Sequence, residues 1–330
     1  MKKELLVMAI LGCLSVNPVY ASDVSESVVT TIGSSVDEDG SINGHELSNN
    51  LVNQGISSAI NNATKDENAP EWLKRTDIQI QFKENWKPVY AIETIQPLNQ
   101  KEYSVVFSQF RLANTSELGT TANIGFGYRK MNQDKTSLYG VNTFYDHAFK
   151  HDHARVGMGL EYFNGLSEFR ANMYHGVSDE KKVDEKYNIF EKVVDGYDIE
   201  LATSLKNAQW AKIYVQGYCW NYKYAADIKG YKVGTELQLT PRLSLDFGYD
   251  KNNSQSGEGY AKVMYTLGNK DMPSWRGEKQ APVEMMSAPT VEHKMLQKVR
   301  RENDIRVERY TKDEQGNIIP GEIRVSIKMR

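Results

Sequence analysis

Between residues 77 and 267, apolar and polar side chains alternate over segments of roughly ten residues that turn residues separate. In residues 122–129 the even positions are apolar or aromatic, and in residues 243–250 the odd positions are. Such alternation places every second side chain on one face of a β-strand. A soluble sandwich also alternates, but glycines and charges on the polar side suit a wet lumen, and aromatic residues at segment ends suit membrane interfaces. The pattern favours an all-β outer-membrane barrel.

The number and spacing of the segments predict the topology of this barrel. Twelve segments can be counted, at residues 77–83, 89–98, 103–113, 120–131, 137–147, 154–164, 166–178, 193–205, 210–222, 229–239, 243–252 and 258–267. The even-numbered gaps are short, whereas the seventh, residues 179–192, is long and highly charged. Barrels of this class have short periplasmic turns and longer external loops. We therefore expect a twelve-stranded antiparallel transmembrane barrel over residues 73–268, with the odd-numbered gaps outside.

The first 21 residues have the features of a signal peptide. A basic start at residues 2–3 precedes an apolar run at residues 5–14, and small residues lead up to Ala21. Cleavage between Ala21 and Ser22 is predicted, with lipidation at Cys13 as an alternative. Past this segment, no apolar run approaches the 18 or so residues that a membrane helix needs. The chain is therefore expected to be exported.

Composition and charge narrow the class of protein further. The chain has 19 Tyr and 24 Gly but only 9 Pro, which suits strands and tight turns. Its two cysteines, Cys13 and Cys219, cannot form a disulfide framework. A formal net charge of −3 gives no basic surface, so we expect no nucleic-acid partner.

Residues 22–72 read as a short periplasmic region of polar helix and loop. Within it, residues 35–46 have the donor spacing of an EF-hand calcium loop, with glycine at the sixth position. The oxygen donors would be Asp37, Asp39, Ser41 and Glu46. Ser35 stands where a carboxylate is expected, and acidic turns with glycine are also common linkers. Calcium is the one cofactor that the sequence suggests, and a plain linker remains the alternative.

Charged residues also occur on the polar side of the alternating segments. They are Arg111, Arg129, Arg155, Glu161, Arg170, Asp198, Glu200 and Asp246. We interpret them as pore-lining charges that solvate the lumen rather than as groups that perform chemistry.

The sequence offers little to support an enzyme. It has no GxSxG, P-loop or dinucleotide-binding motif. An outer-membrane hydrolase would need a serine and a histidine side by side, and Ser137 and His175 are available, but no motif links them. Three histidines also cluster with two aspartates, and these residues are Asp146, His147, His151, Asp152 and His153. Because the segments place them on an external loop, we interpret this cluster as a solvated loop rather than a metal site.

Two stretches, Gly140–Asp146 and Asp152–Tyr162, strongly resemble the barrel domain of the inverse autotransporters, the intimin and invasin family. Matching stretches, in the family's order, are residues 70–73, 92–98, 123–129 and 196–198. The resemblance implies type Ve secretion: a twelve-stranded barrel in the outer membrane of a Gram-negative bacterium, with a periplasmic N-terminus. It also implies periplasmic chaperones and the barrel-assembly machinery as partners. In this family the chain after the barrel returns through the pore and carries a passenger to the surface.

The chain after the barrel fits this topology. Residues 290–300 predict a short helix, and the alternation in residues 303–309 predicts a strand. These features resemble the family's pore linker, so residues 269–309 are expected to be a linker and Met295–Arg309 to lie inside the barrel. A surface helix on a soluble domain is the alternative. Residues 310–330, with a hairpin turn at 314–317, are expected to be a short tail without passenger domains.

Three functions remain open at this level. The first is a translocator and anchor that contributes to adhesion or displays a short or separately encoded passenger, with outer-membrane lipid and a host-surface ligand as partners. The second is a plugged or gated pore. The third, an outer-membrane hydrolase, has the least support, and we expect no enzyme.

Overall fold

The computed structural model describes residues 71–83, 88–115, 118–268, 289–313 and 315–319. The predicted signal peptide with its Ala21–Ser22 cleavage site, and the calcium-like loop of Asp37, Asp39, Ser41 and Glu46, lie outside these residues. Among the described residues, no helix is long and apolar enough to cross a membrane.

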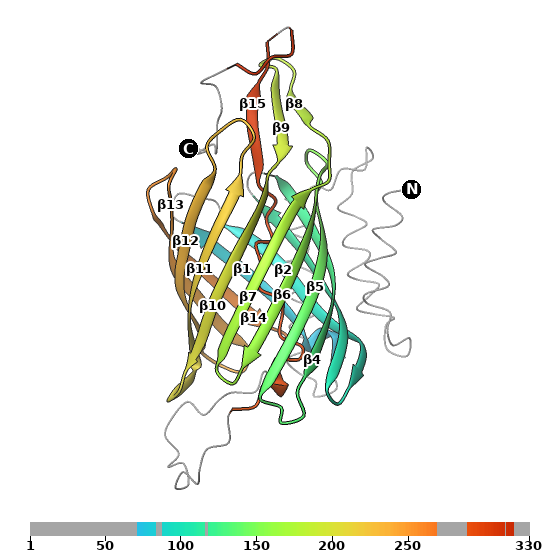
Figure 1. Ribbon diagram of the computed structural model, residues 1–330, viewed down its shortest axis with the longest axis vertical. Coiled ribbons are helices and arrows are strands. Elements are labelled where there is room, and N and C mark those ends of the chain that lie inside the picture. The colour runs from blue at the N-terminus through green and yellow to red at the C-terminus, as the bar shows by residue number, and fades with distance from the viewer. Residues whose placement is uncertain (1–70, 84–87, 116–117, 269–288, 314, 320–330) are drawn as a thin grey trace.

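Twelve antiparallel strands form a closed barrel (Figure 1). They are β1 (Thr76–Lys83), β2 (Val89–Lys101), β3 (Ser104–Thr115), β4 (Gly119–Met131), β5 (Ser137–Ala148), β6 (His153–Asn164), β7 (Ser167–Gly176), β10 (Asp195–Leu205), β11 (Ala208–Asn221), β12 (Ile228–Gln238), β13 (Leu243–Asn252) and β14 (Glu258–Thr266). Each pairs with the next barrel strand along the chain, and β1 closes the barrel against β14, with Ile78 opposite Tyr265. The predicted strand number and antiparallel topology are confirmed.

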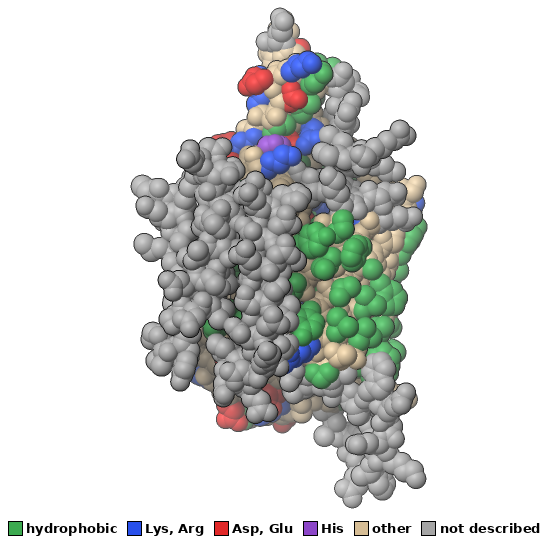
Figure 2. All heavy atoms as spheres, turned by 180° about the vertical axis from the view of Figure 1, so that it is seen from behind, with side chains coloured by type: hydrophobic (Ala, Val, Ile, Leu, Met, Phe, Trp, Pro, Cys, Tyr) green, Lys and Arg blue, Asp and Glu red, His purple; other side chains and the backbone are tan. Residues whose placement is uncertain are grey.

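The predicted alternation corresponds to the two faces of the barrel wall. On β6, Met158 and Leu160 are exposed on the outside, while Gly157, Gly159 and Glu161 face inward. Figure 2 shows hydrophobic side chains over the visible described part of the wall. Because the barrel is closed, every strand pairs on both sides, which a lipid environment requires.

Two glycines on the inner face of β4 make room for aromatic rings. A Cβ atom at Gly125 would lie 2.3 Å from the Phe144 ring, and one at Gly127 would lie 2.2 Å from the Phe107 ring. The rings lie against the wall and form a buried apolar cluster that also contains Val299, from the chain after the barrel. The apolar core of the molecule is therefore inside the barrel.

A three-stranded sheet stands at one end of the barrel, at the top of Figure 1. We call it the external sheet, because it lies outside the barrel. Its order is β15 (Val307–Thr311), β9 (Ile189–Val193) and β8 (Lys181–Asp184). The long charged gap at residues 179–192 therefore contains two strands of this sheet, which the sequence did not predict. Only the pairing of β8 with β9 is local, because β15 pairs with β9 from more than a hundred positions away.

Residues 291–306 run through the barrel from end to end (Figure 1). At one end the amide of Val291 donates to the carbonyl of Lys135, in the β4–β5 turn, at 2.8 Å. At the other end the amide of Val194 donates to the carbonyl of Arg306 at 2.9 Å. We call residues 291–306 the lumen segment.

The secondary structure of the chain after the barrel differs from the prediction. The helix expected over residues 290–300 is only a 3₁₀ turn, η2 (Glu292–Lys294). The strand expected over residues 303–309 is β15, which starts at Val307 and lies outside the barrel in the external sheet. On either side of the expected hairpin turn, Lys312 and Ile318 form an antiparallel bridge, and the Asp313 amide donates to the Asn317 carbonyl at 2.9 Å. At the other end of the barrel domain, helix α5 (Glu71–Lys74) buries Leu73 in contact with Leu267.

Candidate functional site

All eight charged residues predicted to line the pore lie on barrel strands and are buried. They are Arg111, Arg129, Arg155, Glu161, Arg170, Asp198, Glu200 and Asp246. They lie on the inner face of the wall, as the alternation of the segments predicts. There they pair with one another, with neighbouring wall residues and with the lumen segment, because this segment occupies the space that water would fill.

Arg129, on β4, connects the wall to the lumen segment. Its Nε and Nη2 atoms donate to the two carboxylate oxygens of Glu161 at 2.9 and 3.0 Å. Its Nη1 donates to the backbone carbonyls of Met295 and Gln297 at 3.0 and 2.5 Å. A buried guanidinium needs such a set of partners, since an unpaired buried charge is costly. Arg129 thereby takes carbonyls that a continuing helix would use.

Arg155, on β6, makes a second connection of the same kind. Its Nε donates to Asp146 Oδ2 at 2.8 Å. Its Nη2 and Nη1 donate to the backbone carbonyls of Glu302 and Asp304 at 2.8 and 3.1 Å.

Neutral side chains of the wall also bind the backbone of the lumen segment. The contacts are Asn123 Nδ2 to Asn303 O at 2.9 Å, Asn172 Nδ2 to Arg300 O at 3.2 Å, Val299 N to Gln109 Oε1 at 2.8 Å, and Glu302 N to Tyr174 OH at 2.7 Å. These residues come from β3, β4 and β7. Much of the binding between the wall and the segment therefore does not depend on the side chains of the segment.

Basic side chains of the segment pair with acidic residues of the wall. The pairs are Lys294–Glu168 at 3.0 Å, Lys298–Asp77 at 2.8 Å, Arg300–Glu200 at 3.0 Å and Arg301–Asp146 at 2.6 Å. In the opposite sense, Arg111 lies 3.5 Å from Asp304 of the segment. The wall and the segment thus have complementary charges.

The remaining predicted residues are partnered within the wall. Asp198 accepts from Tyr174 and Asn172 at 2.6 and 2.8 Å, and Asp246 accepts from Tyr214 at 2.6 Å. Arg170 bridges Glu168 and Glu200. Glu168 was not among the predicted residues, although it lies two positions before Arg170 and therefore on the same face of β7.

A cavity of about 570 Å³ remains beside the lumen segment. The segment forms one side, and strands that include β1 and β10–β14 form the other. Its lining contains charges of both signs, such as Glu200, Lys232 and Lys262. The lumen is therefore occupied but not completely filled.

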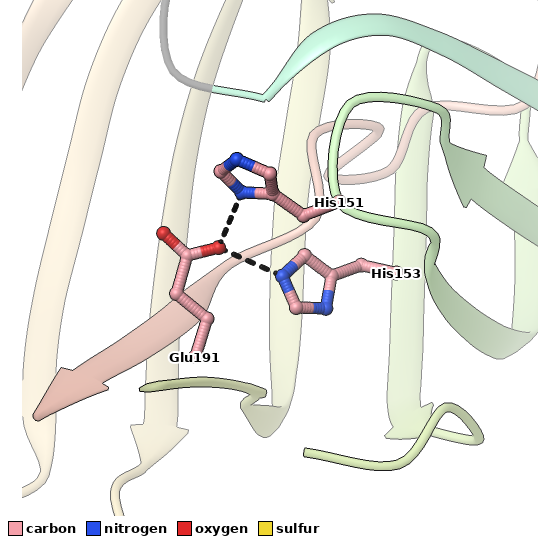
Figure 3. Close-up of side chains that lie close together, drawn as sticks. All are labelled: His151, His153 and Glu191. Atoms are coloured by element: carbon pink, nitrogen blue, oxygen red, sulfur yellow. Dashed lines mark hydrogen bonds and ion pairs between the residues drawn. The ribbon is translucent and has the colours of Figure 1, made fainter. Parts of the chain in front are cut away.

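The histidines of the predicted solvated loop are divided among different surroundings. His147 faces Asp152 at 3.3 Å, and Asp146 points into the lumen toward Arg155 and Arg301. His151 and His153 converge on Glu191 of β9 instead (Figure 3). The side chains of His153 and Glu191 are fully buried, so the interpretation as a solvated loop is wrong for His153.

Glu191 also accepts hydrogen bonds from Arg309 of β15. Burial raises the pKa of Glu191, but the hydrogen bonds from His151, His153 and Arg309 outweigh it and hold this pKa well below its ordinary value. Glu191 therefore carries its charge where the chain leaves the barrel.

Ser137 and His175 do not form a hydrolytic pair. Ser137 begins β5 at the end of the barrel where the lumen segment enters, whereas His175 lies near the end of β7, on the side of the external sheet. His175 is exposed and hydrogen-bonded to Asp195 at 2.8 Å.

Comparisons with known proteins agree with this architecture. The family model described as "Inverse autotransporter, beta-domain" matches residues 27–303. The "Putative attaching and effacing protein homolog" of Escherichia coli K12 is 32% identical over 178 residues, which are 53% of this chain and 52% of that protein. "Invasin" of Yersinia enterocolitica is 24% identical over 176 residues, which are 49% of this chain and 21% of that protein.

The chain thus spans about half the length of the first of these relatives and less of the second. A chain solved in a study of in-meso crystallization of membrane proteins has the same fold, with a TM-score of 0.59 and 17% identity, and the match covers 71% of this chain and 99% of that one. The protein resides in the outer membrane, with lipid around its apolar outer face. Since the family model covers most of the sequence, the chain belongs to the inverse autotransporter family.

Proposed function

We propose that this protein is a translocator and anchor that threads its own C-terminal chain through the barrel and displays the residues beyond Thr311 at the cell surface. It thereby serves adhesion, through a short passenger or one encoded separately that binds a host-surface ligand. The external sheet marks the surface end, because the longer loops of such barrels face outward. Periplasmic chaperones and the barrel-assembly machinery bring the barrel to the membrane.

The observation that carries this proposal is the binding of the segment through its backbone. Arg129, Arg155, Asn123 and Asn172 all donate to main-chain carbonyls of the lumen segment. Every residue offers such a carbonyl, whatever its side chain. A wall of this kind suits a pore through which polypeptide of varied sequence passes.

An accessibility experiment tests the proposal. An epitope tag is placed after Arg330, and single cysteines replace Val299 or Ile305, which are buried, in a Cys219→Ala background. The matched control is a cysteine at Tyr187, which is 61% exposed between β8 and β9. On intact cells we expect surface detection of the tag, labelling at position 187 by an impermeant reagent, and protection at positions 299 and 305. A tag found only in the periplasm, with both lumen cysteines labelled from that side, contradicts the proposal.

The cavity of about 570 Å³ beside the segment favours a second candidate, a plugged pore. Conductance of the purified protein with and without residues 285–330 separates the two. A plugged pore opens to a large, steady conductance when the segment is removed, and its tag never reaches the surface. A gene for a passenger-like chain beside this one would support separate encoding.

A further inference from the structure

Three side chains that are distant in sequence converge outside the lumen (Figure 3). His151 lies in the β5–β6 loop, His153 begins β6 and Glu191 lies on β9. His151 Nδ1 and His153 Nε2 are each 2.8 Å from the same carboxylate oxygen, Glu191 Oε2. The three potential ligand atoms all lie within 4.8 Å of one another.

We propose that these residues form a binding site for a divalent transition-metal ion of the zinc type. Two imidazole nitrogens and one carboxylate oxygen are the donor set of many zinc sites that keep an open position. Bonds of about 2.0–2.2 Å at tetrahedral angles place ligand atoms roughly 3.4 Å apart. To admit the ion, the two contacts to Oε2 would open by about half an ångström, and the two histidine nitrogens, which lie within 4.8 Å of each other, would reach the same separation.

Burial supports a built site rather than a chance surface contact. His153 and Glu191 are fully buried, and the His153 Nδ1 atom has no hydrogen-bond partner among the described residues. His153 makes one hydrogen bond, to an oxygen that also binds His151, and this compensates only part of the free-energy cost of burying a polar ring. A metal bond through Nε2 would replace this shared hydrogen bond with a stronger contact, and the ring proton would then lie on Nδ1, which faces no acceptor among the described residues. His151 is 20% exposed and leaves a side open for a water ligand.

Arg309 completes the surroundings from β15. It donates to Glu191 Oε1, the oxygen that the histidines do not contact. Ligating carboxylates are commonly hydrogen-bonded in this way, which orients the free oxygen toward the ion. The positive charge of Arg309 opposes a second cation, so we expect weaker binding than at a closed four-ligand zinc site. A bound ion would fix β9 to the β5–β6 loop at the point where the chain leaves the barrel.

Metal titration of the purified full chain, prepared without a polyhistidine tag, tests this proposal. Zn²⁺ binding is measured by calorimetry, and Co²⁺ serves as a spectroscopic probe of the ligand geometry. We expect one ion per chain and a tetrahedral Co²⁺ absorption band. His151→Ala and Glu191→Gln should each weaken Zn²⁺ binding about tenfold or more and remove the band. His175→Ala is the matched control, because this histidine is 73% exposed and pairs with Asp195 outside the cluster.

Heat-modifiable migration on gels shows that each variant still forms the barrel, so a loss of binding cannot be attributed to misfolding. The proposal is overturned if the parent protein binds no Zn²⁺ in excess metal, or if both variants bind as the parent does. Binding that survives in both variants and disappears in Asp37→Asn would assign the ion to the N-terminal loop, which also overturns it. None of these results depends on whether the tail reaches the surface.

Discussion

Arg301 of the lumen segment and Asp146 of β5 form a two-point ion pair inside the barrel. Nη1 lies 2.7 Å from Oδ1 and Nη2 lies 2.6 Å from Oδ2, and both side chains are buried. Oδ2 also accepts from Arg155 of the wall. One carboxylate therefore binds two buried arginines, one from the wall and one from the segment.

Asp146→Asn is expected to destabilise this contact strongly. Removing one partner of a buried ion pair typically costs about 3–5 kcal/mol, because the other charge remains buried without compensation. The temperature at which heat-modifiable migration is lost should fall, and a cysteine at position 299 should become reactive. The double variant Asp146→Asn, Arg301→Met removes one stranded charge and should recover part of the loss. An unchanged midpoint in the single variant would contradict this account.

A charge on the outer face of the wall is expected to impair assembly. Met158 is 63% exposed near the middle of β6, where the wall meets lipid. Met158→Arg should cost about 2–4 kcal/mol near the bilayer midplane and reduce the folded fraction in outer-membrane preparations. Tyr187→Arg is the control. Tyr187 is 61% exposed and lies between β8 and β9, so this variant should assemble normally. Equal yields of the two variants would place position 158 outside the membrane.

The pairing of β15 with β9 can be tested by cross-linking. Ile189 and Thr311 are direct partners in the register, so cysteines at these positions should form a disulfide under mild oxidation. The pair at 189 and 309 is offset by two positions and should cross-link far less. Mass spectrometry of the oxidised protein distinguishes the two, and efficient cross-linking of the offset pair would show that the register is wrong.

The contact of Tyr310 and Lys312 with Glu180, which precedes β8, is expected to weaken in acid. Burial raises the pKa of Glu180, but hydrogen bonds from Lys312 and Tyr310 outweigh this and lower it below 4.5. A lowered folded-state pKa means that the stabilisation is complete above about pH 4.5 and is lost as the pH falls through the folded value. Hydrogen exchange of the β15 amides, corrected for intrinsic rates, should become faster as the pH falls. Glu180→Gln should abolish this pH dependence. A parent and a variant with the same pH profile would contradict the assignment to Glu180.

The barrel could be predicted because its signal is local. A strand with one face in lipid and one in the lumen must alternate, so single segments such as residues 122–129 indicate their own conformation. The same alternation also identified residues of the inner face, such as Arg129 and Asp198. It could not select their partners, because pairing depends on register between strands and on a segment more than a hundred residues away.

The helix, the external sheet and His153 were predicted wrongly or not at all for one physical reason: groups that are distant in sequence determine these structures. Residues 290–300 have helical spacing of apolar side chains, but Arg129 binds carbonyls that a longer helix would need. The external sheet escaped detection because β8 and β9 are short and β15 is remote in sequence. His153 was assigned to solvent because nothing near it in the sequence indicates that Glu191 covers it.

The antiparallel pairing of β15 with β9 determines how the molecule bears mechanical load. A pull on the chain beyond Thr311 acts along β15 away from the barrel, while β9 is held at its opposite end, where it leads through Val194 into β10. The ladder bonds lie perpendicular to the strands, so tension shears all of them at once instead of opening them one after another. The load therefore reaches the barrel by two routes, through the ladder into β10 and through the covalent continuation of β15 into the lumen segment.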